Sequence, residues 1–256
     1  MKHIQLSTPG ASLAVSPENL LITFQEPHYS LSTAIYGGGF RSVRFALNRR
    51  LTSFYPTEKD FPGGSPAAWL ARCAEECGAV PEESAVLLTA AKVDHFSHKI
   101  IRSGNILVEA VTTGGVEKTA CRASSAPLYR EEKGTFGPMG TINMMVLFHG
   151  SLPDGIMARA LITLTEGKTA ALQDMGIADV NNGKPATGTG TDGITFITDS
   201  AAPLYTDAGP FSELGASLAR AAYESVTECL MKYGPSLECL PTFKDSHSCK
   251  SEPVKS

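Results

Sequence analysis

Apolar residues recur along this chain with two different periods, which predicts a mixture of strands and helices. Runs typical of strands are HIQL, SLAV, LLITF and STAIY within residues 3–36, AVLLTAA at 85–91, ILVEAVTT at 106–113, TINMMVLF at 141–148 and ITFIT at 194–198. Turn-forming pairs such as Pro9-Gly10 and Ser16-Pro17, together with Glu26-Pro27-His28, separate the first four runs and predict hairpins at one side of a sheet. Five consecutive apolar residues, Met144 to Phe148, predict a strand buried on both faces.

Helical periodicity occurs in three longer stretches, at 65–78, 154–176 and 211–233. Ser65 and Asp154 are suitable N-caps, and Gly78 and Gly176 are suitable residues to end the first two helices. The predicted fold is α/β: a layered, mixed β-sheet packed by several long helices, forming a single domain over residues 1–233. Residues 234–256 lack periodicity, and we expect them to form a loose C-terminal tail.

Composition excludes several classes of protein. The chain has 42% hydrophobic and 19% charged residues, as expected of a soluble globular protein. A net charge of −4 gives no support to nucleic-acid binding, which requires a basic face. No apolar run is long enough to span a bilayer, and the first ten residues lack the apolar core of a signal peptide. Six cysteines are too sparse for a disulfide scaffold. We therefore expect a cytoplasmic protein without nucleic-acid or membrane partners. Whether the chain forms a homo-oligomer stays open.

Three motifs suggest cofactors or metals but lack the required context. Gly188 to Gly193 matches Gly-x-Gly-x-x-Gly, yet the dinucleotide fingerprint needs a strand before it and a helix after it. Gly167-Lys168-Thr169 matches the end of a P-loop, but it lies within a predicted helix. Asp94, His95 and His98 form one short local cluster without a distant further ligand. We predict no resident metal or cofactor.

The polar residues that could carry chemistry fall in three places. Glu166 and Lys168 lie in the helix predicted at 154–176, and Asn143 lies within an apolar strand. The loop before the last strand contributes Thr187, Thr189, Thr191 and Asp192. Structural roles are also open: Glu166 can be an exposed helical carboxylate, Lys168 can extend along the helix surface, and Asp192 can accept backbone amides in a turn. Asn143 is harder to explain in this way, because a buried amide must find partners.

Several segments, taken in order, resemble the adenosylcobinamide amidohydrolases (the CbiZ family) of corrinoid salvage. They are STAIYGGGFRSVRFALNRRL at 32–51, TAAKV at 89–93, GTIN at 140–143, TEGKTAAL at 165–172, ATGTGTD at 186–192 and GPFSELGASLARAAYESV at 209–226. The resemblance covers nearly the whole chain up to Tyr233. One departure is Gly167, which stands where the family usually has Ala and weakens the helix by up to roughly 1 kcal/mol.

The resemblance implies an amidohydrolase that cuts the amide joining aminopropanol to the corrin ring of adenosylcobinamide, giving adenosylcobyric acid. The candidate catalytic residues are Glu166, Lys168, Asp192, Thr191 and Thr189. The candidate substrate-binding residues are Asn143, Thr141, Thr187, Gly188, Gly190, Gly38, Gly39 and Asn48. The partner is the corrinoid substrate, whose cobalt arrives within the ring.

As a working mechanism, Glu166 acts as general base on water or on a threonine hydroxyl of the loop. Lys168 or Asp192 orients the base or protonates the leaving amine. Asn143 and the loop amides stabilise the oxyanion. Two alternatives are a corrinoid-binding protein without turnover and an amidohydrolase that acts on another amide.

Overall fold

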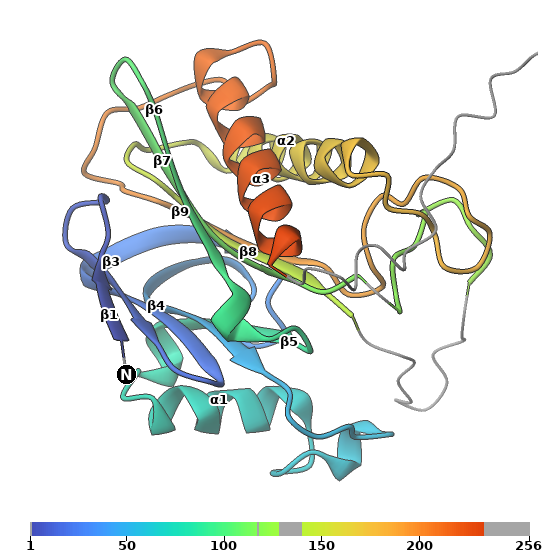
Figure 1. Cartoon of the computed structure of the whole chain (residues 1–256). Helices are drawn as coiled ribbons and strands as arrows, with labels where there is room; N and C mark the ends of the chain where they lie inside the picture. The colour runs from blue at the N-terminus through green and yellow to red at the C-terminus, as the bar shows by residue number, and fades with distance from the viewer. Residues whose placement is uncertain (1, 117, 128–139, 233–256) are drawn as a thin grey trace, which may run out of the picture.

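The computed structural model describes residues 2–116, 118–127 and 140–232, which form nine strands and three α-helices (Figure 1). The strands are β1 (Lys2–Gln5), β2 (Ala11–Val15), β3 (Asn19–Ser32), β4 (Gly39–Arg50), β5 (Ser84–Thr89), β6 (Ser97–Ser103), β7 (Ile106–Gly114), β8 (Ile142–Phe148) and β9 (Gly193–Thr198). The helices are α1 (Pro66–Glu76), α2 (Asp154–Asp174) and α3 (Glu213–Met231). None of the helices in these described ranges is long and apolar enough to cross a membrane.

One curled, mixed sheet contains all nine strands, in the order β1-β2-β3-β9-β8-β7-β6, with β4 pairing both β3 and β5. The long strand β3 makes the curl possible. Its first half pairs with β2 and its second half with β9, while β4 follows it on the other edge, with a register shift between Thr23 and His28. The parallel pairs are β8 with β9 and β4 with β5, so the predicted mixed sheet is confirmed.

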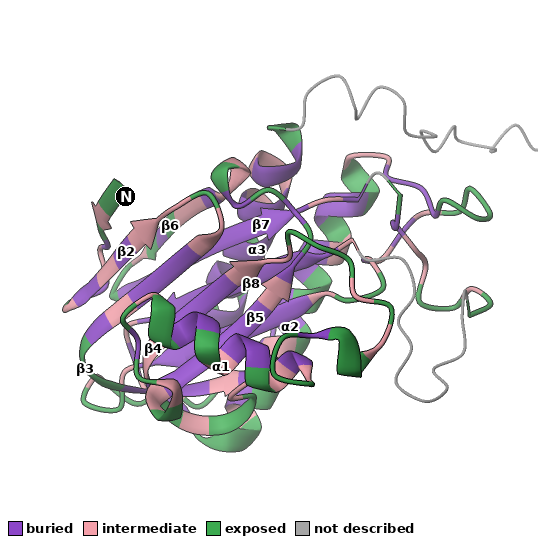
Figure 2. Cartoon of the chain, turned by 90° about the horizontal axis from the view of Figure 1, so that it is seen from below, coloured by how far each residue is buried: buried purple, intermediate pink, exposed green. Residues whose placement is uncertain are grey.

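The curl produces three packed layers of apolar side chains. The first lies between strands β6–β9 and the helices α2 and α3, and the second between the two parts of the curled sheet. The third lies between α1 and strands β3, β4 and β5. Alternate residues of β8 enter different layers: Met144 and Val146 face the helices, and Met145 and Leu147 face the other part of the sheet. Every residue of β8 is buried (Figure 2), as the sequence predicted.

The helix and strand boundaries correct several expectations. The prediction of several long helices is wrong, because α1 has only 11 residues while α2 and α3 have 21 and 19. Residues 20–36 were expected to form two strands, but β3 runs on through Glu26-Pro27-His28. Strands β4 and β6 were not predicted, since their charged residues conceal the alternation of buried positions. The predicted tail at 234–256 lies outside the described residues.

Helix ends follow local chemistry with one exception. The Ser65 hydroxyl accepts a hydrogen bond from the Ala68 amide at 3.1 Å, and Gly78 and Gly176 have φ of 81° and 67°. These features confirm the predicted N-cap of α1 and the predicted ends of α1 and α2. Asp154 is not the N-cap of α2: Pro153 holds that position, and the Asp154 carboxylate instead accepts the Tyr29 hydroxyl at 3.1 Å.

The two long helices approach closely at Gly167. A Cβ placed on Gly167 would overlap the carbonyl oxygen of Ala219 in α3 and lie 3.0 Å from its Cα. Glycine is therefore required by the packing of this pair of helices, even though it is a poor helix former. This contact also sets the position of the next residue, Lys168.

Candidate active site

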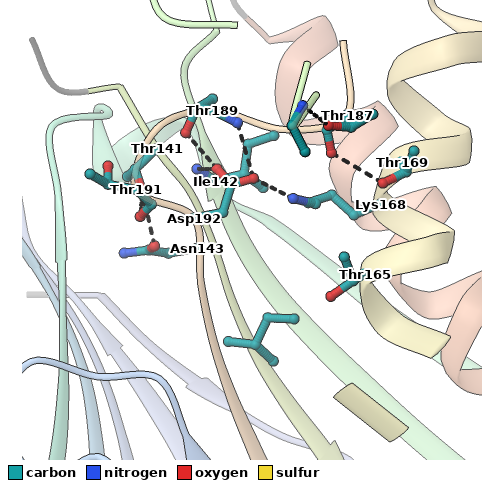
Figure 3. A network of polar contacts seen from close by, with 12 residues as sticks. Thr141, Ile142, Asn143, Thr165, Lys168, Thr169, Thr187, Thr189, Thr191 and Asp192 are labelled. Atoms are coloured by element: carbon teal, nitrogen blue, oxygen red, sulfur yellow. Dashed lines mark hydrogen bonds and ion pairs between the residues drawn. The ribbon is translucent and has the colours of Figure 1, made fainter. Parts of the chain in front are cut away.

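The candidate site lies where the parallel strands β8 and β9 begin. Asn143 of β8 pairs with Gly193 of β9, and the loop of residues 186–192 (the 186–192 loop) leads into β9 at this point (Figure 3). Helix α2 passes beside the loop, since the Thr169 hydroxyl donates to the Thr187 carbonyl at 3.1 Å. Segments from both halves of the chain meet here.

Asp192 is the centre of the polar contacts. Its Oδ2 receives the Lys168 ammonium and, at 3.1 Å, the backbone N–H of Thr189. Its Oδ1 lies 2.5 Å from the Thr189 hydroxyl and accepts the backbone N–H of Ile142 at 2.9 Å. We call Lys168, Gly188, Thr189, Asp192 and the Ile142 amide the Asp192 cluster. Both carboxylate oxygens are used, so the carboxylate is held in one orientation.

Burial makes the ion pair at the centre of the cluster significant. The side chains of Lys168 and Asp192 are only 7% and 15% exposed. Isolated charges at such positions would be costly, so each requires the other. Gly188 leaves the room that the pair needs, because a Cβ there would overlap Asp192 Oδ2 and lie 2.7 Å from Lys168 Nζ.

The threonine hydroxyls fasten the loop to the segment before β8. Thr189 Oγ1 and Thr191 Oγ1 lie 2.7 and 2.9 Å from the Gly140 carbonyl, and Thr141 Oγ1 donates to the Thr191 carbonyl at 2.5 Å. Thr187 Oγ1 accepts the Ala123 amide at 2.9 Å. Thr189 has a second acceptor in Asp192, so its single proton can bond either the carbonyl or the carboxylate.

Asn143 and Asn48 form a buried amide ladder between the two parts of the sheet. Asn143 Nδ2 donates to Asn48 Oδ1 and to the Leu88 carbonyl, both at 2.9 Å, and Asn48 Nδ2 donates to Thr113 Oγ1 at 2.8 Å. Each asparagine is 1% exposed. The prediction that Asn143 needs partners is confirmed, and those partners are protein groups.

The tip of the 186–192 loop is the open part of the site. Gly190 and Thr191 are exposed, and Thr189 is partly exposed. Within the described ranges, no carbonyl or side chain accepts the backbone N–H of Gly190 or Thr191. These amides are free to bind an oxygen atom of a ligand.

Three of the predicted site residues are not brought to the cluster. Residues two apart on a helix point about 200° from each other, so Glu166 faces away from Asp192 when Lys168 faces it. Glu166 is exposed and lines a surface hollow with Arg159 and Ile162. Gly38 and Gly39 lie at the start of β4, and β3 separates Gly39 from β9.

The structure adds Cys121, which the sequence analysis did not single out. Its backbone N–H donates to the Gly188 carbonyl at 2.9 Å, and its carbonyl accepts the Thr187 amide at 2.9 Å. Burial, followed by the Asp192 and Asp179 carboxylates, raises the pKa of the Cys121 thiol. The thiol is thereby kept protonated at neutral pH and is a weak nucleophile. No local pattern in the sequence marks this residue.

The described residues contain no group of three or more His, Cys, Asp or Glu placed to hold a metal. In the cluster that the sequence considered, His98 Nε2 instead lies 2.9 Å from Glu109 Oε1. That no added metal is needed stays a prediction.

Comparison with known proteins adds three findings. The family model of adenosylcobinamide amidohydrolase matches residues 7–237, which include the whole Asp192 cluster and extend beyond Tyr233. An uncharacterized protein of Methanocaldococcus jannaschii, MJ1613, is 29% identical over 233 residues, covering 84% of this chain and 86% of that protein. The crystal structure of the PH0078 protein from Pyrococcus horikoshii aligns with a TM-score of 0.46 at 11% identity, covering 86% of this chain and 79% of that one.

Proposed function

The chain belongs to the adenosylcobinamide amidohydrolase family, and from this premise we propose that it hydrolyses the amide between aminopropanol and the corrin ring of adenosylcobinamide. The products are aminopropanol and adenosylcobyric acid. One observation carries the proposal: the Thr189 hydroxyl lies 2.5 Å from the carboxylate of Asp192, which is itself paired with Lys168. A hydroxyl, a carboxylate and a lysine in contact resemble the Ser–Lys variants of the catalytic triad.

In the proposed mechanism the Thr189 hydroxyl attacks the carbonyl carbon of the substrate. Its proton moves to the Lys168–Asp192 pair, which it already contacts through Asp192 Oδ1. The pair then returns the proton to the amine nitrogen as the carbon–nitrogen bond breaks. Water hydrolyses the resulting ester and restores the hydroxyl.

The free amides at the loop tip suit the charge that develops during attack. A tetrahedral intermediate carries an oxyanion, which backbone N–H groups stabilise when they are already oriented towards it. Gly190 and Thr191, one and two residues after the nucleophile, are exposed, and their N–H groups have no acceptor among the described residues. Losing one oxyanion donor typically costs about 10²–10³-fold in rate.

Asn143, Asn48 and Thr141 are assigned to positioning in this proposal. Thr141 holds the Thr191 carbonyl at 2.5 Å and lies 3.2 Å from Asn143 Oδ1. The asparagine ladder thus helps to hold Thr141, which in turn holds the 186–192 loop. The side-chain amides of the ladder are already bonded to protein groups. The proposal replaces Glu166 with the Lys168–Asp192 pair as the proton acceptor, because Glu166 faces the opposite side of α2.

The test is release of aminopropanol from adenosylcobinamide by the purified full-length chain, measured by mass spectrometry. Wild-type protein and Thr189→Ser should release it, and Thr189→Ala should be reduced at least about 10²-fold, because the attacking hydroxyl is gone. Trapping of a corrinoid ester on a peptide containing Thr189 would support the covalent step directly.

Other outcomes separate the alternatives. Tight binding of adenosylcobinamide without release of aminopropanol would indicate a corrinoid-binding protein. Failure to bind it, combined with hydrolysis of a simpler amide, would indicate a different substrate. Near-native turnover by Thr189→Ala would overturn the assignment of the nucleophile and leave the attack to water.

A further inference from the structure

The outward face of α2 is not covered by any described part of the chain. Five of its residues, at successive spacings of four, three, four and four, are exposed: Gly155, Arg159, Ile162, Glu166 and Ala170. They follow one side of the helix. Ile162 is 60% exposed, which is unusual for a large aliphatic side chain in the middle of a long helix.

Apolar groups from a second segment extend this face. A hollow of about 310 Å³ lies between α2 and Pro210, in the segment that leads into α3. The neighbouring Phe211 is fully exposed at 105%. Ile162 and Pro210 line this hollow together with Arg159 and Glu166, and Phe211 follows Pro210 in the chain. We call these five residues the α2 outer face. Apolar residues rimmed by charges are typical of a protein-binding surface.

The two charges of the α2 outer face lack partners in the described structure. Among the residues it describes, neither the Arg159 guanidinium nor the Glu166 carboxylate forms an ion pair or a side-chain hydrogen bond. They are seven residues apart, or about 10 Å along the helix axis. Ile162 lies between them.

We propose that a second copy of this chain binds to the α2 outer face, with the two α2 helices antiparallel. A two-fold axis passing near Ile162 places Arg159 opposite the partner subunit's Glu166, and Glu166 opposite the partner subunit's Arg159. The two Ile162 side chains then meet at the axis. Gly155 comes opposite the partner subunit's Ala170, and these small residues allow the helices to approach to about 8–10 Å.

The argument for a second copy, rather than another protein, is self-complementarity. A two-fold interface requires one surface to supply both members of every contact. Here one helix face carries a positive and a negative charge at nearly equal distances on either side of an exposed isoleucine. Because Lys168 points away from this face, the dimer leaves the Asp192 cluster accessible. The proposal therefore does not depend on the reaction.

The first experiment measures the mass of the wild-type chain by sedimentation velocity over a wide range of concentration. We expect a reversible dimer with twice the mass of one chain. A protein that stays monomeric at every concentration overturns the proposal.

Charge reversal then tests the geometry. Arg159→Glu and Glu166→Arg should each place like charges together and raise the dimer dissociation constant at least about tenfold. The double variant Arg159→Glu/Glu166→Arg should return it to within about threefold of wild type, because both opposite-charge contacts are restored in reverse. A dimer unaffected by the single changes, or not restored by the double change, contradicts the antiparallel arrangement.

Two more variants serve as a probe and a control. Ile162→Asp should abolish the dimer, since it places two carboxylates at the axis. Arg102→Glu, an equal change of charge at an exposed position of β6, should leave the dissociation constant unchanged. Thermal unfolding of each variant verifies the fold, because such surface changes usually alter stability by less than about 0.5 kcal/mol. An equal weakening by Arg102→Glu would mean that net charge, rather than the α2 outer face, controls association.

Discussion

Two carboxylates of this protein, Asp192 and Glu109, are held by dense hydrogen bonding yet differ in what surrounds them. Glu109 in β7 is 0% exposed and bonds the Thr8 hydroxyl at 2.6 Å, the amides of Ser7 and Thr8 at 2.8 and 2.5 Å, and His98 at 2.9 Å. These contacts fasten the turn after β1 to β6 and β7. Asp192 is also held on both oxygens, but it lies beside an exposed loop tip and contacts the hydroxyl of Thr189, a partly exposed residue. Saturated bonding alone therefore does not identify a catalytic group, and the feature that distinguishes Asp192 from Glu109 is the exposed loop tip beside it.

Asp192→Asn should produce the largest effect on activity. The amide cannot take up the Thr189 proton and no longer pairs with Lys168, so the release of aminopropanol should fall by about 10²–10⁴-fold. The variant also leaves the lysine charge without its partner, which should lower the free energy of unfolding by about 3 kcal/mol. Activity is measured at a temperature where circular dichroism shows the variant to be folded. A folded Asp192→Asn protein with near-native turnover would erase the distinction between the two carboxylates.

Glu109→Gln should affect stability and spare catalysis. Gln cannot accept four charge-assisted contacts, so we expect a loss of about 2 kcal/mol, or a fall in melting temperature of roughly 4–8 °C. Calorimetry measures this fall, and turnover per folded molecule should match wild type. Loss of turnover without loss of stability would mean that Glu109 influences the geometry of the candidate active site.

Acidification should remove the stability that the hydrogen bonds of Glu109 contribute to the fold. Burial raises the pKa of Glu109, but the hydrogen bonds from His98, Thr8 and Ser7 outweigh it, so the pKa lies below its ordinary value of 4.5. A carboxyl group whose pKa is lowered by folding stabilises the protein above its unfolded pKa, and that contribution is lost as the pH falls through the folded pKa. The difference in unfolding free energy between wild type and Glu109→Gln should be constant above about pH 5 and shrink below pH 4.5. A difference that grows on acidification contradicts the lowered pKa.

Glu166→Gln should have the smallest effect. Glu166 is exposed on the outer side of α2, and replacing an exposed carboxylate usually changes stability by less than about 0.5 kcal/mol. Turnover should stay near wild type in the aminopropanol assay, with Asp192→Asn measured beside it. A fall of about 10²-fold or more would restore Glu166 as the general base.

Local features of the structure were predictable from the sequence, and longer-range ones were not. The buried strand β8 and the end of α2 at Gly176 depend on neighbouring residues, so pattern and turn chemistry predicted them. Strand β4 was missed because its arginines conceal the alternation of buried positions. In the structure Arg49 pairs with Glu18 at 2.7 Å and lies 5.6 Å from the ring centre of Trp69. The helical register separates Glu166 from Lys168, although the two are neighbours in one motif.

The candidate site shows the same division. Lys168 and Asp192 are 24 residues apart, and only the resemblance to a family grouped them before the structure did. Asn143 was expected to need partners, but no rule of spacing could name Asn48, which is 95 residues away. Cys121 had no signal at all, because its role comes from backbone pairing with Gly188.

The contact of Gly167 with Ala219 has a mechanical consequence for the lysine that follows it. Rotation of α2 about its axis, or sliding along α3, would have to change the separation of two backbones that are already touching. The helix pair thus restricts both the direction in which the Lys168 side chain leaves α2 and its position along the helix axis. A lysine side chain has four rotatable bonds and a high conformational entropy. Because the backbone of Lys168 is already fixed, only its side chain remains to be ordered. The alignment of the ammonium with Asp192 is in this sense a property of how tightly two helices fit together.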